Sequence, residues 1–203
     1  MSLWKQSLQP EPRFNAKQWK TLYPSLIYNK HGDVNWKITH RVLPTALALN
    51  KIGVYPTSSC HRCSATDNLE HAILECPTVG NFWNRVQTYV DKITDRKLTL
   101  TTQVKLFGKV NTKNEPLGSR SIDLVNWTLT LARWAIYKSA VNYRLQKDLT
   151  FSPEALFKAL VRSHLRFQYK LPKSRCTLYY FPHDWCKGQS FAKLENDNLV
   201  FTL

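Results

Sequence analysis

Three stretches of the chain repeat their hydrophobic residues with the period of an α-helix. In NFWNRVQTYVDKI one helical face carries Phe82, Val86, Tyr89, Val90 and Ile93. Residues 123–147 are apolar on most sides, which is typical of a central, buried helix. Residues 152–170 are apolar on one face only, with Ser152 as a predicted N-cap and Pro153 at the first helical position.

Other stretches predict shorter elements and breaks. Residues 36–51 are expected to be helical with an interruption before Pro44, and Gly53 suits a C-terminal cap. Residues 108–121 combine Gly, Pro, Asn and Ser with few apolar residues, which predicts a linker. The C-terminal sequence SFAKLENDNLVFTL predicts two short strands around a three-residue turn. The pattern therefore favours a mainly α fold that ends in a β-hairpin.

Composition places the chain among folded proteins. Hydrophobic residues make up 43% of its 203 residues, enough to build one sizeable domain or two small ones. No stretch approaches the roughly 18 apolar residues that a membrane helix needs. The first residues, MSLWKQSLQPEPRF, lack the apolar segment of a signal peptide. We expect a soluble, intracellular protein that does not bind a membrane.

The net charge indicates a polyanionic partner. Lys and Arg total 29 against 14 Asp and Glu, which gives a formal charge of +15. Such an excess is typical of proteins that bind nucleic acid, although it could also serve solubility alone. The arrangement of the basic residues favours nucleic acid.

Basic residues recur at helical spacing in two places. The first row comprises Lys158, Arg162, Arg166 and Lys170, with Tyr169 beside it. Like charges four positions apart repel by a few tenths of a kcal/mol, roughly, so the row is better explained by phosphate contacts than by helix stability. The second stripe covers about a sixth of a helix circumference: Arg133, Tyr137, Arg144 and Lys147. His164 lies on the apolar face and is expected to be a core histidine.

Three cysteines and a histidine form the pattern Cys60-x2-Cys63-x7-His71-x4-Cys76. Cys-x2-Cys lets two thiolates grip one ion, and a following short helix can supply the second pair of ligands. Asp67 is a plausible N-cap for that helix. Four protein ligands leave no position for a substrate water, so the pattern predicts one structural Zn²⁺. The fold class becomes mainly α with a small zinc knuckle and a short C-terminal β-hairpin.

The remaining cysteines do not indicate a second site. Five cysteines is an odd number, and three fall in the knuckle, which favours reduced thiols over a disulfide framework. Cys176, His183 and Cys186 lack a close Cys-x2-Cys pair and a fourth ligand, and we expect them to be structural.

The knuckle and its surroundings resemble the C-terminal zinc-binding region of LINE-type reverse transcriptases, the replication proteins of non-LTR retrotransposons. The matching residues lie within residues 36–83: Trp36, His40, Arg41, Leu43, Pro44, Thr45, Gly53, Cys60, Cys63, His71, Cys76, Pro77, Phe82 and Trp83. Seven residues separate the second Cys from the His, against four in retroviral knuckles, so the retroviral mode of base binding is not transferred. Phe82 and Trp83 are expected in the core rather than stacked on bases.

The resemblance implies a non-catalytic module that assists target-primed reverse transcription beside a polymerase and an endonuclease. The catalytic Tyr-x-Asp-Asp motif of a polymerase is absent from the sequence. Expected partners are RNA, single-stranded or nicked DNA, and the catalytic parts of the parent protein, within a ribonucleoprotein of cytoplasm and nucleus. Arg41 and Arg62 join the two basic rows as expected contacts. The sequence does not distinguish RNA from DNA, or an element from a domesticated gene.

Two alternatives remain, and both concern the role of the zinc lobe. It could organise a docking surface for the polymerase, or the chain could be a metal-dependent hydrolase, which the fully ligated site argues against. The expected organisation is a lead at 1–35, a zinc-knuckle lobe at 36–107, the linker at 108–121, and a basic helical lobe with the hairpin at 122–203.

Overall fold

The computed structural model describes residues 22–23, 28–109, 116–145, 152–174, 181, 185–196 and 198–203. Its helices are α2 (Asn29–Thr39), α3 (Ala46–Lys51), the π-helix η1 (His71–Glu75), α4 (Pro77–Thr94), α5 (Thr102–Phe107), α6 (Ser119–Arg144), α7 (Pro153–Ser174) and the 3₁₀ turn η2 (Lys187–Gln189). Two antiparallel strands follow, β1 (Ala192–Glu195) and β2 (Asn198–Phe201). The mainly α fold with a C-terminal hairpin is confirmed.

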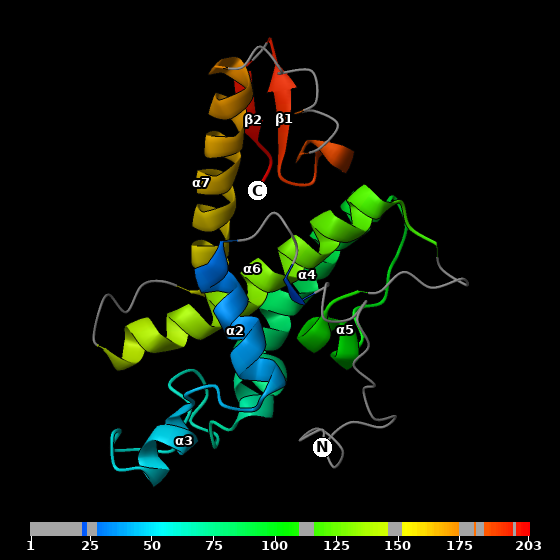
Figure 1. Ribbon diagram of the computed structural model, residues 1–203. Coiled ribbons are helices and arrows are strands. Elements are labelled where there is room, and N and C mark those ends of the chain that lie inside the picture. The colour runs from blue at the N-terminus through cyan, green and yellow to red at the C-terminus, as the bar shows by residue number, and fades with distance from the viewer. Residues whose placement is uncertain are drawn as a thin grey trace.

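Helix α6 lies at the centre of the described structure, as its apolar pattern predicts. Helices α2, α4, α5 and α7 all pack against it (Figure 1). Its inward-facing residues include Trp127, Leu129 and Ile136, each at most 1% exposed. Because α6 is covered on several sides, it needs apolar residues around most of its circumference.

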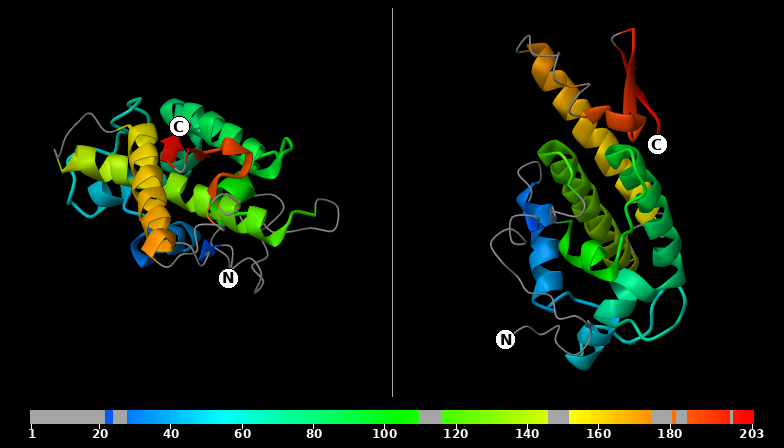
Figure 2. Two further views of the ribbon diagram at one scale, coloured as in Figure 1. Left: turned by 90° about the horizontal axis from the view of Figure 1, so that it is seen from above. Right: turned by 90° about the vertical axis from the view of Figure 1, so that its right-hand side faces the viewer.

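One hydrophobic core extends across the boundary predicted at residues 108–121. Ile38 and Trp83 from the first part of the chain belong to the same buried cluster as Trp127 and Phe157 from the second. Helix α6 itself begins at Ser119, inside the predicted linker, while residues 110–115 lie outside the described part. The two predicted lobes therefore share their packing, as the second view in Figure 2 also illustrates.

Arg133 lies in this core, and its predicted position in a surface basic stripe is wrong. The side chain is fully buried. Its Nε donates to Asn35 Oδ1 at 2.7 Å, Nη1 to the Lys105 carbonyl at 2.9 Å and Nη2 to Thr130 Oγ1 at 2.9 Å. Burial lowers the pKa of its guanidinium to about 9, so the group stays charged at neutral pH. Its hydrogen bonds join α2, α5 and α6.

Helix α7 packs against α6, and strand β2 of the hairpin packs against α7. The predicted N-cap is confirmed, because Ser152 Oγ accepts a hydrogen bond from the Ala155 N–H at 3.1 Å. In the hairpin Glu195 pairs with Asn198, which leaves two turn positions rather than the predicted three. Asn196, at one of them, has a φ of 47°, a conformation that Asn adopts more readily than most residues.

Among the described residues, no helix is both long enough and apolar enough to cross a membrane.

Candidate functional site

Four donor atoms meet where the knuckle predicts a metal. The Sγ atoms of Cys60 and Cys76 lie 4.0 Å apart, and those of Cys76 and Cys63 lie 3.9 Å apart. Cys63 Sγ lies 3.2 Å from His71 Nε2, and all four donors are within 4.8 Å of one another. Tetrahedral ligands at roughly 2.3 Å from one ion place neighbouring sulfurs about 3.8 Å apart. The donor set therefore fits one zinc ion.

A tight turn holds the first two ligands. The Cys60 N–H donates to the Ala65 carbonyl at 2.7 Å, and the Ser64 N–H donates to the Cys60 carbonyl at 2.8 Å. The Arg62 N–H points at Cys60 Sγ at 3.4 Å, a contact that stabilises a thiolate. Ser64 closes the turn with a φ of 64°. The backbone thus supplies both the turn and a donor to one ligand.

The other two ligands lie at the ends of η1, and its π-helical geometry brings them together. His71 and Cys76 are five positions apart, which would place them about 140° apart around an ordinary α-helix. Here the Cys76 N–H donates to the His71 carbonyl at 3.0 Å, the wider i→i+5 turn of a π-helix. Widening the turn brings residues five apart closer to one face.

The capping residue of this segment is Asn68 rather than Asp67. Asn68 Oδ1 accepts a hydrogen bond from the His71 N–H at 2.8 Å. Asp67 Oδ2 instead accepts from the Ala46 N–H at 2.8 Å, at the start of α3. The sequence prediction is therefore wrong by one position, because an aspartate can cap a helix distant in sequence as well as its own.

The side chain of Trp83 hydrogen-bonds to the backbone of η1. Its indole N–H donates to the Ile73 carbonyl at 2.8 Å. In a regular helix that carbonyl would accept from position 77, but Pro77 has no N–H. Trp83 is 1% exposed, so the prediction that it belongs to the core is confirmed. Its role as a hydrogen-bond donor beside the metal ligands was missed.

The four ligands differ in how exposed they are to solvent. Cys60, His71 and Cys76 are buried, whereas Cys63 is exposed. Burial raises the pKa of the Cys60 thiol to about 11. Without a cation this thiol stays protonated, so zinc binding has to release a proton here.

Comparison with known proteins agrees with this geometry. A family model described as zinc-binding in reverse transcriptase matches residues 1–83. These residues are therefore similar to a zinc-binding domain of reverse transcriptases. The domain holds one structural zinc, bound by Cys60, Cys63, His71 and Cys76. The predicted resemblance is confirmed.

The zinc-binding domain and most of the remaining chain also resemble a transposon protein. The 149 kDa protein of transposon TX1 from Xenopus laevis is 28% identical over 191 residues, which cover 91% of this chain. The chain spans only 13% of that relative's length. No solved structure matches the chain.

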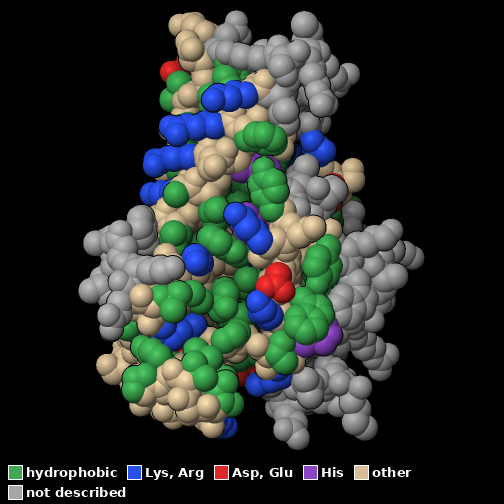
Figure 3. Space-filling model, turned by 60° about the vertical axis from the view of Figure 1, so that its left-hand side comes forward, with side chains coloured by type: hydrophobic (Ala, Val, Ile, Leu, Met, Phe, Trp, Pro, Cys, Tyr) green, Lys and Arg blue, Asp and Glu red, His purple; other side chains and the backbone are tan. Residues whose placement is uncertain are grey.

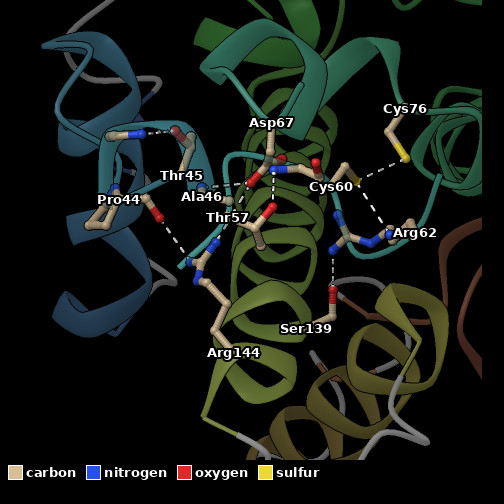
Figure 4. Close-up of polar contacts among 12 residues, drawn as sticks. Pro44, Thr45, Ala46, Thr57, Cys60, Arg62, Asp67, Cys76, Ser139 and Arg144 are labelled. Carbon is tan, nitrogen blue, oxygen red and sulfur yellow. Dashed lines mark hydrogen bonds and ion pairs between the residues drawn. The ribbon is translucent and has the colours of Figure 1, made fainter. Parts of the chain in front are cut away.

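Two arginines attach the zinc-binding domain to α6 (Figure 4). Arg144 donates to the Pro44 carbonyl at 2.8 Å and lies 3.7 Å from the Asp67 carboxylate, with both side chains less than 10% exposed. Arg62 donates to the Ile136 carbonyl at 3.0 Å and to Ser139 Oγ at 2.5 Å. Both arginines were predicted to contact nucleic acid, and here they connect α6 to the turns that carry the ligands.

The other predicted contact residues lie in different surroundings. Arg41 forms an ion pair with Glu70 at 2.5 Å, next to His71. Tyr137 and Tyr169 are half-buried against the core. Lys147 lies outside the described residues. The second predicted stripe is therefore not assembled as a continuous surface.

Three of the four basic residues predicted as a row on α7 lie on an exposed face of that helix. Arg162, Arg166 and Lys170 are exposed, and we call these three residues the basic face. Figure 3 shows Lys and Arg side chains stacked in a column along this helix. Lys158, the fourth residue of the predicted row, is half-buried and pairs with Glu154 at 2.9 Å.

An aromatic side chain from the hairpin supports the basic face. The guanidinium carbons of Arg162 and Arg166 lie 6.0 and 5.4 Å from the centre of the Phe201 ring. Such cation–π contacts hold arginines in place while leaving their N–H groups free for an anion. Sequence reasoning missed Phe201, because nothing in the sequence pairs the hairpin with this helix. A hollow of about 520 Å³ lies beside the face, lined by all three basic residues.

Proposed function

We propose that the chain is a non-catalytic, zinc-stabilised module that binds single-stranded nucleic acid, RNA or DNA, through the basic face. One observation carries the proposal: three exposed basic side chains follow one face of α7, and two of them rest on an aromatic ring. Repeated like charge destabilises a helix slightly, and a row of phosphates removes that repulsion. Contacts of this kind supply affinity with little sequence specificity.

In the longer protein the module would assist target-primed reverse transcription. The transposon relative and the zinc-binding domain of the reverse transcriptase family support a place beside polymerase and endonuclease parts. The module would hold RNA or nicked DNA while those parts react, within a ribonucleoprotein that passes from cytoplasm to nucleus. The zinc would act structurally, since four protein ligands already complete its tetrahedral shell.

Charge reversal on the basic face tests the proposal. Arg162→Glu with Arg166→Glu should weaken binding of single-stranded RNA and DNA at least about tenfold and lower the salt dependence of binding. Lys92→Glu with Lys97→Glu is the matched control, because both lysines are exposed and give the same change in net charge. Lys92 lies in the last turn of α4 and Lys97 follows the helix. Equilibrium titrations at two salt concentrations measure both effects. If both double variants lost the same amount of nucleic-acid affinity, binding would depend only on total charge and the proposal would be contradicted.

A second candidate function is docking onto the polymerase part through the zinc-binding domain. Three aliphatic side chains near α3 are strongly exposed: Ile52 at 70%, Val54 at 68% and Val42 at 52%. Exposed aliphatic residues are common individually, but a group of them indicates a contact surface. Replacing Ile52 and Val54 with Ser should abolish binding to the polymerase part in a pull-down and leave nucleic-acid affinity unchanged.

A further inference from the structure

A cavity of about 200 Å³ lies between α2, α6 and α7, away from the zinc ligands. Its volume corresponds to roughly seven water molecules at about 30 Å³ each. Five of the described lining residues carry aromatic rings: Tyr28, His31, Trp127, His164 and Phe167. Tyr28 and Phe167 are about half exposed and lie at its rim, while Trp127 is buried.

Two histidines in the lining have unused polar atoms. His31 is 3% exposed and His164 is 8% exposed. Neither ring nitrogen of His31, nor Nε2 of His164, has a hydrogen-bond partner among the described residues. Burial lowers the pKa of both histidines to about 4, so at neutral pH each ring has one N–H donor and one acceptor nitrogen. Buried polar groups are normally paired, so three unpaired buried nitrogens on two residues that line one cavity are unusual.

The rings around these nitrogens suit a flat ligand. Tyr28 contacts both histidines edge to face, with ring centres 5.9 and 6.0 Å away. His164 also lies 5.0 Å from the Trp127 ring centre. A planar ligand with donors and acceptors on its edge could stack on an aromatic ring and pair with the imidazoles. Metal binding is a weaker match, because the zinc centre is the only group of three or more metal donors found in the described residues.

The cavity lies next to the hollow beside the basic face. Ser163 and Phe167 line both spaces, and Lys30 lines the cavity. Among the described residues, no carboxylate lines either of them. In Figure 3 hydrophobic and histidine side chains lie next to the column of basic side chains. A ligand that fits both spaces has a flat polar ring joined to a negatively charged chain.

We propose that the cavity binds one nucleobase of a single strand whose phosphates lie on the basic face. This inference rests on the proposed function and adds a base-binding position to it. His31 and His164 hydrogen-bond to the edge of the base, and the surrounding aromatic rings contact its faces. Two histidines that can each donate or accept accommodate more than one base.

Abasic oligonucleotides test the inference. The zinc-loaded chain is titrated with a short oligo-adenosine single strand and with an abasic strand of equal length, which keeps the phosphates but has no bases. The abasic strand should bind about tenfold more weakly, in line with the stacking contribution of a single base. His31→Phe and His164→Phe should remove most of that difference. His40→Phe, the same substitution outside the cavity, should preserve it.

The outcomes separate this inference from the proposed function. If neither strand binds, both are overturned; if both bind equally well, only the base-binding cavity is overturned. A second measurement on the unaltered protein covers variants that do not fold. The imidazole ¹⁵N shifts of His31 and His164 should change with the oligo-adenosine strand and not with the abasic strand. Unchanged shifts with both strands would overturn the inference.

Discussion

At the scale of single residues, arginines in this protein divide into structural and exposed groups. Arg133 is enclosed by neutral oxygen acceptors, and Arg62 and Arg144 bond to backbone carbonyls of neighbouring elements. Arg162 and Arg166 lie in solvent over an aromatic ring. Guanidinium groups serve both purposes, because five donors in a fixed plane can satisfy several carbonyls or one phosphate.

Replacing Arg133 with Met should destabilise the fold substantially. The substitution keeps much of the side-chain volume but leaves Asn35 Oδ1 and the Lys105 carbonyl without their donors. We expect the free energy of unfolding to fall by about 3 kcal/mol, since each buried unsatisfied group costs roughly 1–3 kcal/mol. Urea denaturation followed by circular dichroism measures it. Arg166→Met is the control at an exposed position, and a similar small loss in both variants would mean that the Arg133 network contributes little.

At the scale of elements, the zinc ligands depend on short segments that have little stability of their own. Helix α3 has six residues and η1 has five. Isolated helices of this length are not stable in water. Around the Cys60–Cys63 turn, the β-type pairing that the described residues show is one isolated bridge, between Ser59 and Thr66. The metal and the contacts to α6 must therefore stabilise the folded conformation of these segments.

Cys63→Ser should release the zinc and disorder these segments. Cys63 is exposed, so the substitution removes a ligand without opening a hole in the core. We expect zinc content to fall from one equivalent towards zero and amide-exchange protection to disappear in residues 46–76. Cys186→Ser changes a cysteine outside the ligand set and should leave both quantities unchanged. Full zinc content in the Cys63 variant would contradict the assigned site.

At the scale of the whole molecule, α6 joins the zinc-binding domain to the basic face. It receives Arg62 and Asp67 from the ligand-bearing turns on one side, and it packs against α7 on the other. The shared core gives the two regions a common stability. The distance between the zinc centre and the basic face is therefore held by packed helices and not by a linker.

Cooperative unfolding is the expected consequence. Helix content measured by far-ultraviolet circular dichroism and zinc release to a chromophoric chelator should follow the same thermal transition, because neither region retains a complete core without the other. Two separate midpoints, with zinc released first, would instead favour the division into independent lobes at residues 108–121.

The sequence by itself was sufficient for features that depend on local spacing. The Cys60-x2-Cys63 pair, the capping of α7 by Ser152 and the apolar pattern of α6 all follow from residues close together in the chain. Local spacing fixes which residues share a turn or a helical face, and these predictions are confirmed. The identity of the metal ligands belongs to the same group, because zinc chemistry restricts the residue types that can bind it.

The tertiary structure decided which face of each helix is covered by another element and which face stays exposed. Periodicity places Arg133 beside Tyr137 on one stripe but cannot show that α2 and α5 cover it. The same holds for Phe201 under the basic face and for His31 opposite α7, since each contact joins segments far apart in sequence. Burial results from the packing of all the elements together, so it separates the structural arginines from the exposed ones only after the chain has folded.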